Sequence, residues 1–303
     1  MPLSAAFYLA AARQDIIGDE STSLQKIMVS ITMNIFSRIK QKFFSNIRKL
    51  EKHIPFHLRL YFIKATNKKI ISVICVKNEE QYLEDFFSYL RNYVDGFIVL
   101  DDGSTDRTTS IIKSEEKVLS LLTNPPHGPE GWDEPQNRIR VLTEAKKFGD
   151  IVLCCDADER FEEAFLKNLR KIATLCIQNK QTAYGVHFRE LWESYDHYRS
   201  DGIWNTKKKE VIFHLNNKMT FAKTMFQRHH IPWYHDDIQE TVLLNYNLYH
   251  LKMIKREDRI KRYNLYENID PNHDLQSIGY KYLVEERGIE LTKIPASQQY
   301  KLS

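Results

Sequence analysis

Two aspartates separated by a single residue follow an apolar run in the segment IVLCCDADERFEE, residues 151–163. The run IVLCC has the composition of a buried strand, so Asp156 and Asp158 stand just past its end. Like charges so close together repel one another unless something offsets them. Mg²⁺ or Mn²⁺ takes oxygen ligands of this kind and shares its remaining positions with water and phosphate oxygens. The pair therefore predicts a metal site; the alternative is a surface turn with solvated acids.

A second acidic turn follows another predicted strand. Asp101 ends the run GFIVLD (96–101), and Asp102 opens the turn DGSTD. A further apolar run, IISVICV (70–76), comes first, and helical patterns at 79–93, at 106–119 and before residue 150 separate the three runs. Strands that alternate with helices predict an α/β fold with a mostly parallel central sheet. Because ligands bind at the carboxyl ends of parallel strands, both acid pairs should open onto one edge of the sheet.

The chain beyond residue 160 is patterned less regularly. A helix is predicted at 161–178, a strand at 182–188, a β-rich stretch at 241–251 and an amphipathic helix at 256–268.

Charge is unevenly distributed over the 303 residues, although the formal net charge is only +4. Residues 24–70 contain eleven Lys or Arg and one acid, Glu51, whereas the chain after residue 70 is mildly acidic. The basic stretch has no interleaved recognition motif and precedes an acidic body, so binding to nucleic acid is not expected.

The setting of the protein can be predicted from its cysteines and its hydropathy. The four cysteines form no C-x-x-C pair, three of them lie in apolar runs, and no N-x-S/T sequon occurs. These features favour a reducing, cytoplasmic setting. No window reaches the ~18 to 20 apolar residues that span a bilayer, so we expect a protein that is soluble or rests on a membrane.

Apolar residues recur at helical spacing over residues 24–54, with most of the basic residues elsewhere on the helix. One interpretation is a helix that packs on the body or on a second copy of the chain, which would give a homo-oligomer. The other is a helix that lies in the plane of a membrane and is attracted to anionic lipid, so that the protein would be peripheral.

Three blocks, in order and with fitting spacing, together resemble family 2 of the inverting glycosyltransferases. The blocks are ISVICVKNEEQYLEDFFSYL (71–90), VDGFIVLDDGSTDRT (94–108) and FGDIVLCCDADERF (148–161). The resemblance implies the GT-A fold, a Rossmann-like α/β/α sandwich, and a nucleotide-sugar donor. The expected organisation is a basic helical extension (1–69), a nucleotide-sugar-binding half (70–160), an acceptor-binding half of the same domain (161–255) and a C-terminal helical tail (256–303).

The resemblance also implies the donor site. The residues expected to hold the nucleobase, the ribose or the sugar stand at strand ends, at the start of the third helix and in the D-x-D motif: Val76, Lys77, Asn78, Glu79, Asp101, Asp102, Asn137, Arg138 and Asp156. Asp158 would bind the metal that bridges the diphosphate, with Asp156 beside it. His250 resembles a histidine that completes the coordination; a core or capping histidine is its alternative. Mn²⁺ or Mg²⁺ would stabilise the growing charge of the leaving nucleoside diphosphate.

Inverting transfer needs a base that takes the proton of the acceptor hydroxyl. The region HHIPWYHDDIQE (229–240) offers Asp236, Asp237 and Glu240. Their spacing does not decide among them. We favour Glu240, which directly precedes the β-rich stretch, and place Asp237 second. A carboxylate that fixes a loop is the alternative for each.

Aromatic and charged side chains are concentrated in residues 189–204. Aromatic faces stack on sugar rings and charged groups bond hydroxyls, so we expect the acceptor at Trp192, Arg199, Asp201 and Trp204. Ordinary packing of the two tryptophans is the alternative. The chain lacks Q-x-x-R-W, the mark of the processive polysaccharide synthases of this family. We therefore expect transfer of a single sugar from a UDP- or GDP-type donor to a glycan or lipid-linked acceptor.

Two other functions share parts of this pattern. A nucleotidyltransferase of related fold usually has a Gly-rich basic loop after its first strand, and VKNEEQ (76–81) contains no glycine. A non-catalytic protein that binds nucleotides or sugars could retain the fold, because the residues do not settle which carboxylate is the base.

Overall fold

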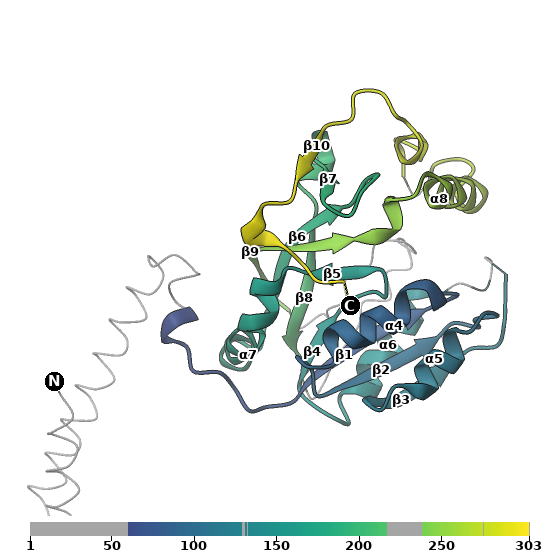
Figure 1. Ribbon diagram of the computed structural model, residues 1–303. Coiled ribbons are helices and arrows are strands. Elements are labelled where there is room, and N and C mark those ends of the chain that lie inside the picture. Colours follow the sequence, from purple (N-terminus) through teal and green to yellow (C-terminus); the bar gives the residue numbers. More distant parts are fainter. Residues whose placement is uncertain (1–59, 129–130, 132, 217–237, 275, 303) are drawn as a thin grey trace, which may run out of the picture. The chain divides into compact units, whose positions relative to one another are not determined.

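The structure is a computed structural model that describes residues 60–128, 131, 133–216, 238–274 and 276–302 (Figure 1). Residues 60–303 form one compact unit. The helix predicted at 24–54 lies outside the described residues, so its contact with a membrane or a second copy stays a prediction. Within the described ranges, no helix has the length and apolar character needed to cross a lipid bilayer.

An eight-stranded sheet in the order β3-β2-β1-β4-β8-β6-β9-β5 forms the centre of the unit. Its strands are β1 (Ile70–Val76), β2 (Gly96–Asp101), β3 (Val118–Thr123), β4 (Ile151–Cys154), β5 (Glu159–Phe161), β6 (Thr182–Glu190), β8 (Lys208–His214) and β9 (Glu240–His250). The first four are mutually parallel, β6 is parallel to β9, and β8 runs antiparallel between β4 and β6. Six strands therefore direct their carboxyl ends to the same edge, which confirms the mostly parallel sheet.

Helices cover both faces of the sheet. They are α4 (Glu80–Leu90), α5 (Thr108–Ser114), α6 (Glu134–Ala145) and α7 (Glu163–Gln178), while a further helix, α8 (Arg256–Ile269), lies beyond the end of β9. Neighbouring strand residues point to opposite faces. Phe97 of β2 contacts Phe87 of α4, with ring centroids 4.9 Å apart, whereas Ile98 packs in one cluster with Val141 of α6. Helices α4 and α6 thus lie on opposite sides of the sheet, as the α/β/α sandwich requires.

The helix predicted at 106–119 is wrong in its second half. Helix α5 ends at Ser114, where the backbone N–H of Glu115 still donates to the carbonyl of Ile112, and strand β3 begins at Val118. Strand β3 pairs only with β2 and is half-buried. It satisfies the backbone groups that β2 would otherwise leave unpaired at the sheet edge, a long-range gain that local helical patterning does not reveal.

The remaining elements lie beside the sheet. A two-stranded sheet joins β7 (His197–Arg199) to β10 (Leu291–Lys293), and the single-turn helices are η2 (Gly202–Asn205), η3 (Leu251–Met253), η4 (Lys281–Leu283) and η5 (Ala296–Gln298). The helix predicted at 256–268 is confirmed as α8.

Local sequence explains how two site elements are positioned. Asp133 accepts a hydrogen bond from the backbone N–H of Gln136 (3.0 Å), and with Pro135 in the first turn it starts α6 at the carboxyl edge of the sheet. Gly103 has a φ of +76°, and a Cβ there would lie 2.5 Å from the carbonyl oxygen of Pro125. Only glycine fits that turn, which places Asp102 at the end of β2.

Candidate functional site

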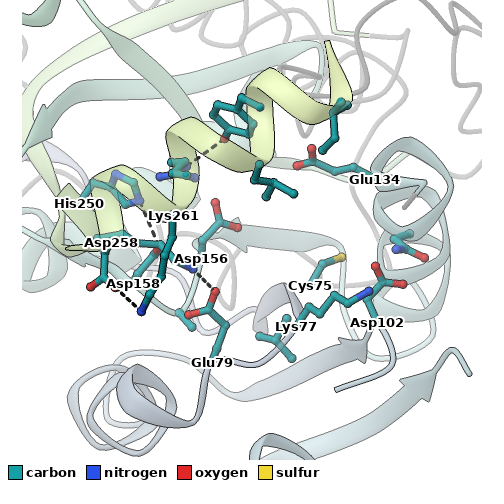
Figure 2. Close-up of a pocket in the computed structure, with 18 of the residues that line it drawn as sticks. Cys75, Lys77, Glu79, Asp102, Glu134, Asp156, Asp158, His250, Asp258 and Lys261 are labelled. Carbon is teal, nitrogen blue, oxygen red and sulfur yellow. Dashed lines mark hydrogen bonds and ion pairs between the residues drawn. The ribbon is translucent and has the colours of Figure 1, made fainter. Parts of the chain in front are cut away.

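A cavity of about 460 Å³ opens at the carboxyl edge of the sheet (Figure 2). Its walls come from the loops after β1, β2 and β4, from the end of β9, and from α6 and α8. Asp102, Asp156 and Asp158 all line it. The prediction that the two acidic turns open onto one edge is therefore confirmed, and its cause is the common direction of β1, β2 and β4.

Asp156 is held by a half-buried lysine. Lys209 of β8 donates from Nζ to Asp156 Oδ2 (2.8 Å) and to Glu159 Oε1 (2.6 Å). Burial would raise the pKa of Asp156, but the positive charges of Lys209 and Arg138 outweigh it and hold that pKa below its usual range. Asp156 is therefore an ionised carboxylate whose charge is already balanced.

Asp158 lies against His250, the last residue of β9. Their Oδ2 and Nε2 atoms are 3.0 Å apart, and Lys252 Nζ is 3.8 Å from the same oxygen. Burial opposes ionisation, but His250 and Lys252 hold the pKa of Asp158 far below its usual range. The sequence predicts that these acids need positive charge beside them. In this structure, side chains of the protein supply that charge.

The other ring nitrogen of His250 lies 2.5 Å from Glu190 Oε2 at the end of β6. Burial would lower the pKa of His250, but the carboxylates of Glu190 and Asp158 raise it to about 9. Glu190 is in turn 2.9 Å from Lys207 Nζ. The imidazole is therefore fixed in orientation by two buried carboxylates.

Glu79 is a further acid at this end of the cavity, and it is paired with Lys252. Its Oε1 accepts from Lys252 Nζ at 2.5 Å, while its Oε2 is buried without a hydrogen-bond partner among the described residues. Burial and the nearby Asp158 raise the pKa of Glu79 to about 7, although Lys252 acts in the opposite direction. A polar ligand in the cavity could satisfy the unpaired oxygen.

The other end of the cavity is polar. Asp102 Oδ1 lies 2.5 Å from Asn124 Nδ2 and 3.0 Å from His127 Nε2, and Asn124 also donates to Asn137 Oδ1 (2.9 Å). Lys77 donates to the carbonyl of His127 (2.9 Å). Burial opposes it, but the hydrogen bonds from Asn124 and His127 keep the pKa of Asp102 below its usual range.

The structure brings most of the predicted donor residues together. Those that line the cavity are Val76, Lys77, Glu79, Asp102, Asn137, Asp156, Asp158 and His250.

Three predicted donor residues do not line the cavity but support its loops. Asn78 Oδ1 accepts from the backbone N–H of Thr105 (2.8 Å), which joins the loops after β1 and β2. Asp101 Oδ1 accepts from the backbone N–H of Ser104 (2.9 Å) and closes its own turn. Arg138 forms an ion pair with Glu134, which does line the cavity. Direct contact of these three with a nucleotide stays a prediction.

The predicted acceptor residues pack against one another. Trp192 and Trp204 are 0% and 2% exposed, with ring centroids 5.8 Å apart. The guanidinium of Arg199 lies 4.8 and 4.7 Å from the two rings and donates two hydrogen bonds to Asp201 (2.8 and 2.9 Å). None of these four described residues lines the cavity. Their burial favours ordinary packing, the alternative to stacking on a sugar.

Glu240 does not lie with the other site residues. It is the first residue of β9, whereas His250, at the cavity, is the last. Ten steps of about 3.3 Å separate the two ends by roughly 33 Å. The exposed Glu240 side chain therefore stands at the amino edge of the sheet, which argues against the prediction that it is the base. Asp237 lies outside the described residues.

Sequence reasoning missed several residues of the site. Lys209, Glu190 and Lys252 reach it from strands and a turn whose partners are distant in sequence. A signal existed for Glu190, because it ends a strand at the carboxyl edge. Arg262 and Tyr266 of α8 also line the cavity, although the helix was expected only as a tail.

The chemistry of Asp158 and His250 fits a divalent cation. A carboxylate oxygen and an imidazole nitrogen are ligands of Mn²⁺, and a carboxylate such as Glu190 behind the histidine is the usual support for a metal ligand. In the described part of the chain, no group of three or more His, Cys, Asp and Glu side chains is arranged to hold a metal. Two protein ligands would leave the remaining positions to diphosphate oxygens and water.

Comparison with known proteins adds the family. The model of glycosyl transferase family 2 matches residues 72–243, more than half of the chain. An uncharacterized glycosyltransferase of Rickettsia typhi is 25% identical over 221 residues, which cover 71% of this chain and 70% of the relative.

Two of the solved structures with some likeness are of mycobacterial proteins. A mycobacterial protein is 22% identical with a TM-score of 0.30, over 42% of this chain and 43% of that one. The glucosyl-3-phosphoglycerate synthase of Mycobacterium tuberculosis, in complex with Mg²⁺ and UDP, is 22% identical with a TM-score of 0.28, over 41% and 44%. This chain thus matches less than half the length of those proteins. The family match, which spans β1 to the start of β9, assigns the chain: it belongs to glycosyl transferase family 2 and is a glycosyltransferase.

Proposed function

We propose that this glycosyltransferase moves one sugar from a UDP- or GDP-type nucleotide sugar to a glycan or lipid-linked acceptor, in a metal-dependent inverting displacement. The observation that carries the proposal is the shared cavity. One end presents the polar set around Asp102, the other presents the Asp158–His250 pair, and both open onto one edge of the sheet (Figure 2).

The polar end is proposed to bind the nucleoside. The ionised Asp102 can accept hydrogen bonds from ribose hydroxyls, and its position is fixed by Asn124 and by the glycine turn before it. Lys77 and Asn137 line the same wall and can bond the base.

The Asp158 end is proposed to hold Mn²⁺ or Mg²⁺. Asp158 and His250 would ligate the ion, Glu190 would orient the imidazole, and Asp156 would contact the metal or the sugar beside it. When bound, the metal would stabilise the charge that grows on the departing nucleoside diphosphate. Residues of the chain would orient the donor so that its anomeric carbon faces the open side of the cavity.

An acid near the cavity must accept the proton of the acceptor hydroxyl. Of the described carboxylates that line the cavity, which include Glu79 and Glu134, we place Asp258 of α8 in this role, whereas Glu240 stands at the opposite edge. Asp237 stays a prediction. The variants Asp258→Asn and Asp237→Asn separate the two: loss of the base should abolish transfer while the binding of nucleotide is retained. Product analysis by NMR should show an inverted anomeric configuration.

The proposal is tested by thermal unfolding with Mn²⁺ and a panel of nucleoside diphosphates. A ligand at 100 times its dissociation constant adds about 2.7 kcal/mol, which should raise the Tm of wild type by roughly 5 to 10 °C. Asp158→Asn should abolish the increase. Glu116→Gln, which changes an exposed carboxylate away from the cavity, should retain it. If no nucleoside diphosphate stabilises wild type in the presence of metal, the proposal fails.

A further inference from the structure

Helix α8 lies outside the residues matched to the family, yet it forms one wall of the cavity. Residues three or four positions apart share one face of a helix. Those of α8 that line the cavity follow this spacing: Asp258, Lys261, Arg262, Leu265, Tyr266 and Ile269. Figure 2 shows the labelled Asp258 and Lys261 directed from this helix into the cavity. Helix α8, which lies outside the residues matched to the family, therefore completes the site.

Arg262 is fixed in this wall by its neighbour one turn along the helix. Its Nε donates to the hydroxyl of Tyr266 (2.9 Å), and its guanidinium carbon lies 5.6 Å from the centroid of that ring. The ring of Tyr266 packs in turn on Tyr280, with centroids 5.1 Å apart. Nε is the only atom of this guanidinium with a hydrogen-bond acceptor among the described residues. Its two terminal amino groups remain available to a ligand.

The guanidinium of Arg262 lies near several carboxylates but forms an ion pair with none of those that the structure describes. It is one of the cations that oppose the effect of burial on the pKa of Asp158 and of Glu79. Nevertheless, Arg262 forms no ion pair with any residue that the structure describes. The other cations near these acids, Lys252 and His250, are already paired with them. Arg262 thus adds positive charge to the cavity without a direct ion-pair partner among the described residues.

We propose that Arg262 binds the diphosphate of the donor through its two terminal amino groups, with Tyr266 as the residue that positions it. The inference rests on the proposed function. A planar guanidinium matches two phosphate oxygens better than a lysine does. During transfer, the bond between the anomeric carbon and the phosphate oxygen breaks and its electron pair stays on that oxygen. The acceptor oxygen forms the new bond and its proton goes to the base, so Arg262 stabilises the charge that appears on the leaving group.

The test is isothermal titration of the full chain with uridine, UMP and UDP, and with the matching guanosine series, in the presence of Mn²⁺. Arg262→Gln should weaken the binding of the diphosphate about 10- to 100-fold, because charge-assisted hydrogen bonds are lost, and should leave the nucleoside unchanged. Arg262→Lys and Tyr266→Phe should give smaller losses. Arg256→Gln is the matched control, since Arg256 begins the same helix and pairs with Glu286 at the surface.

The outcomes separate this inference from the function on which it rests. Equal binding of the diphosphate by wild type and Arg262→Gln would overturn the inference alone. Equal weakening of nucleoside and diphosphate would also overturn it, because Arg262 would then only support the fold. If wild type binds neither series, the proposed function itself fails. Should Arg262→Gln not fold, the loss specific to the diphosphate is sought in Arg262→Lys and Tyr266→Phe, and its absence there refutes the inference.

Discussion

Arg160 offers the sharpest test of how the D-x-D turn is held. Its side chain is fully buried, and its NH1 donates to the carbonyls of Ala157 (2.8 Å) and Glu159 (2.7 Å). Its Nε donates to Asp85 of α4 (2.8 Å), and its guanidinium carbon lies 5.4 Å from the ring centroid of Tyr89. One arginine thus ties the residue between the two aspartates to a helix on the face of the sheet.

The expected loss of unfolding free energy follows from the groups whose hydrogen bonds Arg160→Met would remove. The buried carbonyls of Ala157 and Glu159 would each lose a donor, at a cost of about 1 to 3 kcal/mol each. The carboxylate of Asp85 would lose its bonds to Arg160 but is 25% exposed and can be hydrated. Methionine would recover part of the apolar contact with Tyr89. The variant should therefore lose roughly 3 to 5 kcal/mol of unfolding free energy, in the range expected for a broken buried ion pair.

Urea denaturation measures this loss. With an m-value of about 2 to 3 kcal/mol/M, the midpoint should fall by roughly 1 to 2.5 M. Arg107→Met is the matched control, because Arg107 forms an ion pair with Glu80 across 3.2 Å in which both side chains are exposed, at 74% and 40%. A pair of this kind contributes at most about 1 kcal/mol, so the midpoint of the control should hardly move.

A double-mutant cycle with Asp85→Ala locates the interaction. The sum of the unfolding free energies lost in the two single variants should exceed the loss in the double variant by about 1 to 3 kcal/mol, because the residues are in direct contact. If the unfolding free energy of Arg160→Met lies within about 1 kcal/mol of that of wild type, as expected for a surface pair, Arg160 does not hold the turn as described. The same conclusion follows if the cycle shows no coupling.

Three further predictions follow from the placement of other residues. Glu240→Gln should leave the rate of transfer unchanged, because Glu240 stands at the amino edge of the sheet; a large loss of rate would restore it as the base. Trp204→Ala should cost about 3 to 5 kcal/mol in urea unfolding, because the ring is packed on Trp192; unchanged stability with poor acceptor binding would contradict the packing role. Burial raises the pKa of Glu162, which accepts from Asn247, so the folded state binds its proton more tightly than the unfolded chain does. The contribution of Glu162 to stability should fall as the pH rises from the ordinary pKa of a glutamate through the raised one, so Glu162→Gln should gain relative to wild type across that window; a constant difference would refute this.

The strands and the acidic turns could be predicted because local sequence determines them. The runs ending at Val76 and Asp101 are buried on both faces and therefore almost entirely apolar. Parallel pairing then brings Asp102 and Asp158 to one edge without further information. Strand β3 was missed because its half-buried pattern is compatible with a helix, and only pairing with β2 decides between the two.

The partners of the acidic residues could not be predicted, because they come from positions distant in sequence. Lys209 reaches Asp156 across 53 residues, and His250 reaches Asp158 across 92. For Trp192, the sequence left acceptor binding and ordinary packing open for a different reason. Aromatic residues near charges occur both in sugar sites and in packed cores, and burial tells the two apart.

The balance of charge in the cavity predicts how metal and nucleotide bind. Asp156 is paired with Lys209, and Asp158 with His250 and Lys252, so a divalent cation that entered alone would add positive charge to a balanced set. A diphosphate that entered alone would meet these carboxylates as well as Arg262. A divalent cation and the diphosphate of a nucleotide sugar carry equal and opposite charge, so the two together preserve the balance. We therefore expect the Tm increase with Mn²⁺ and UDP-sugar together to exceed the sum of the increases with each alone. If Mn²⁺ alone produces the whole increase, the internal cations do not compete with the metal in the way this arrangement requires.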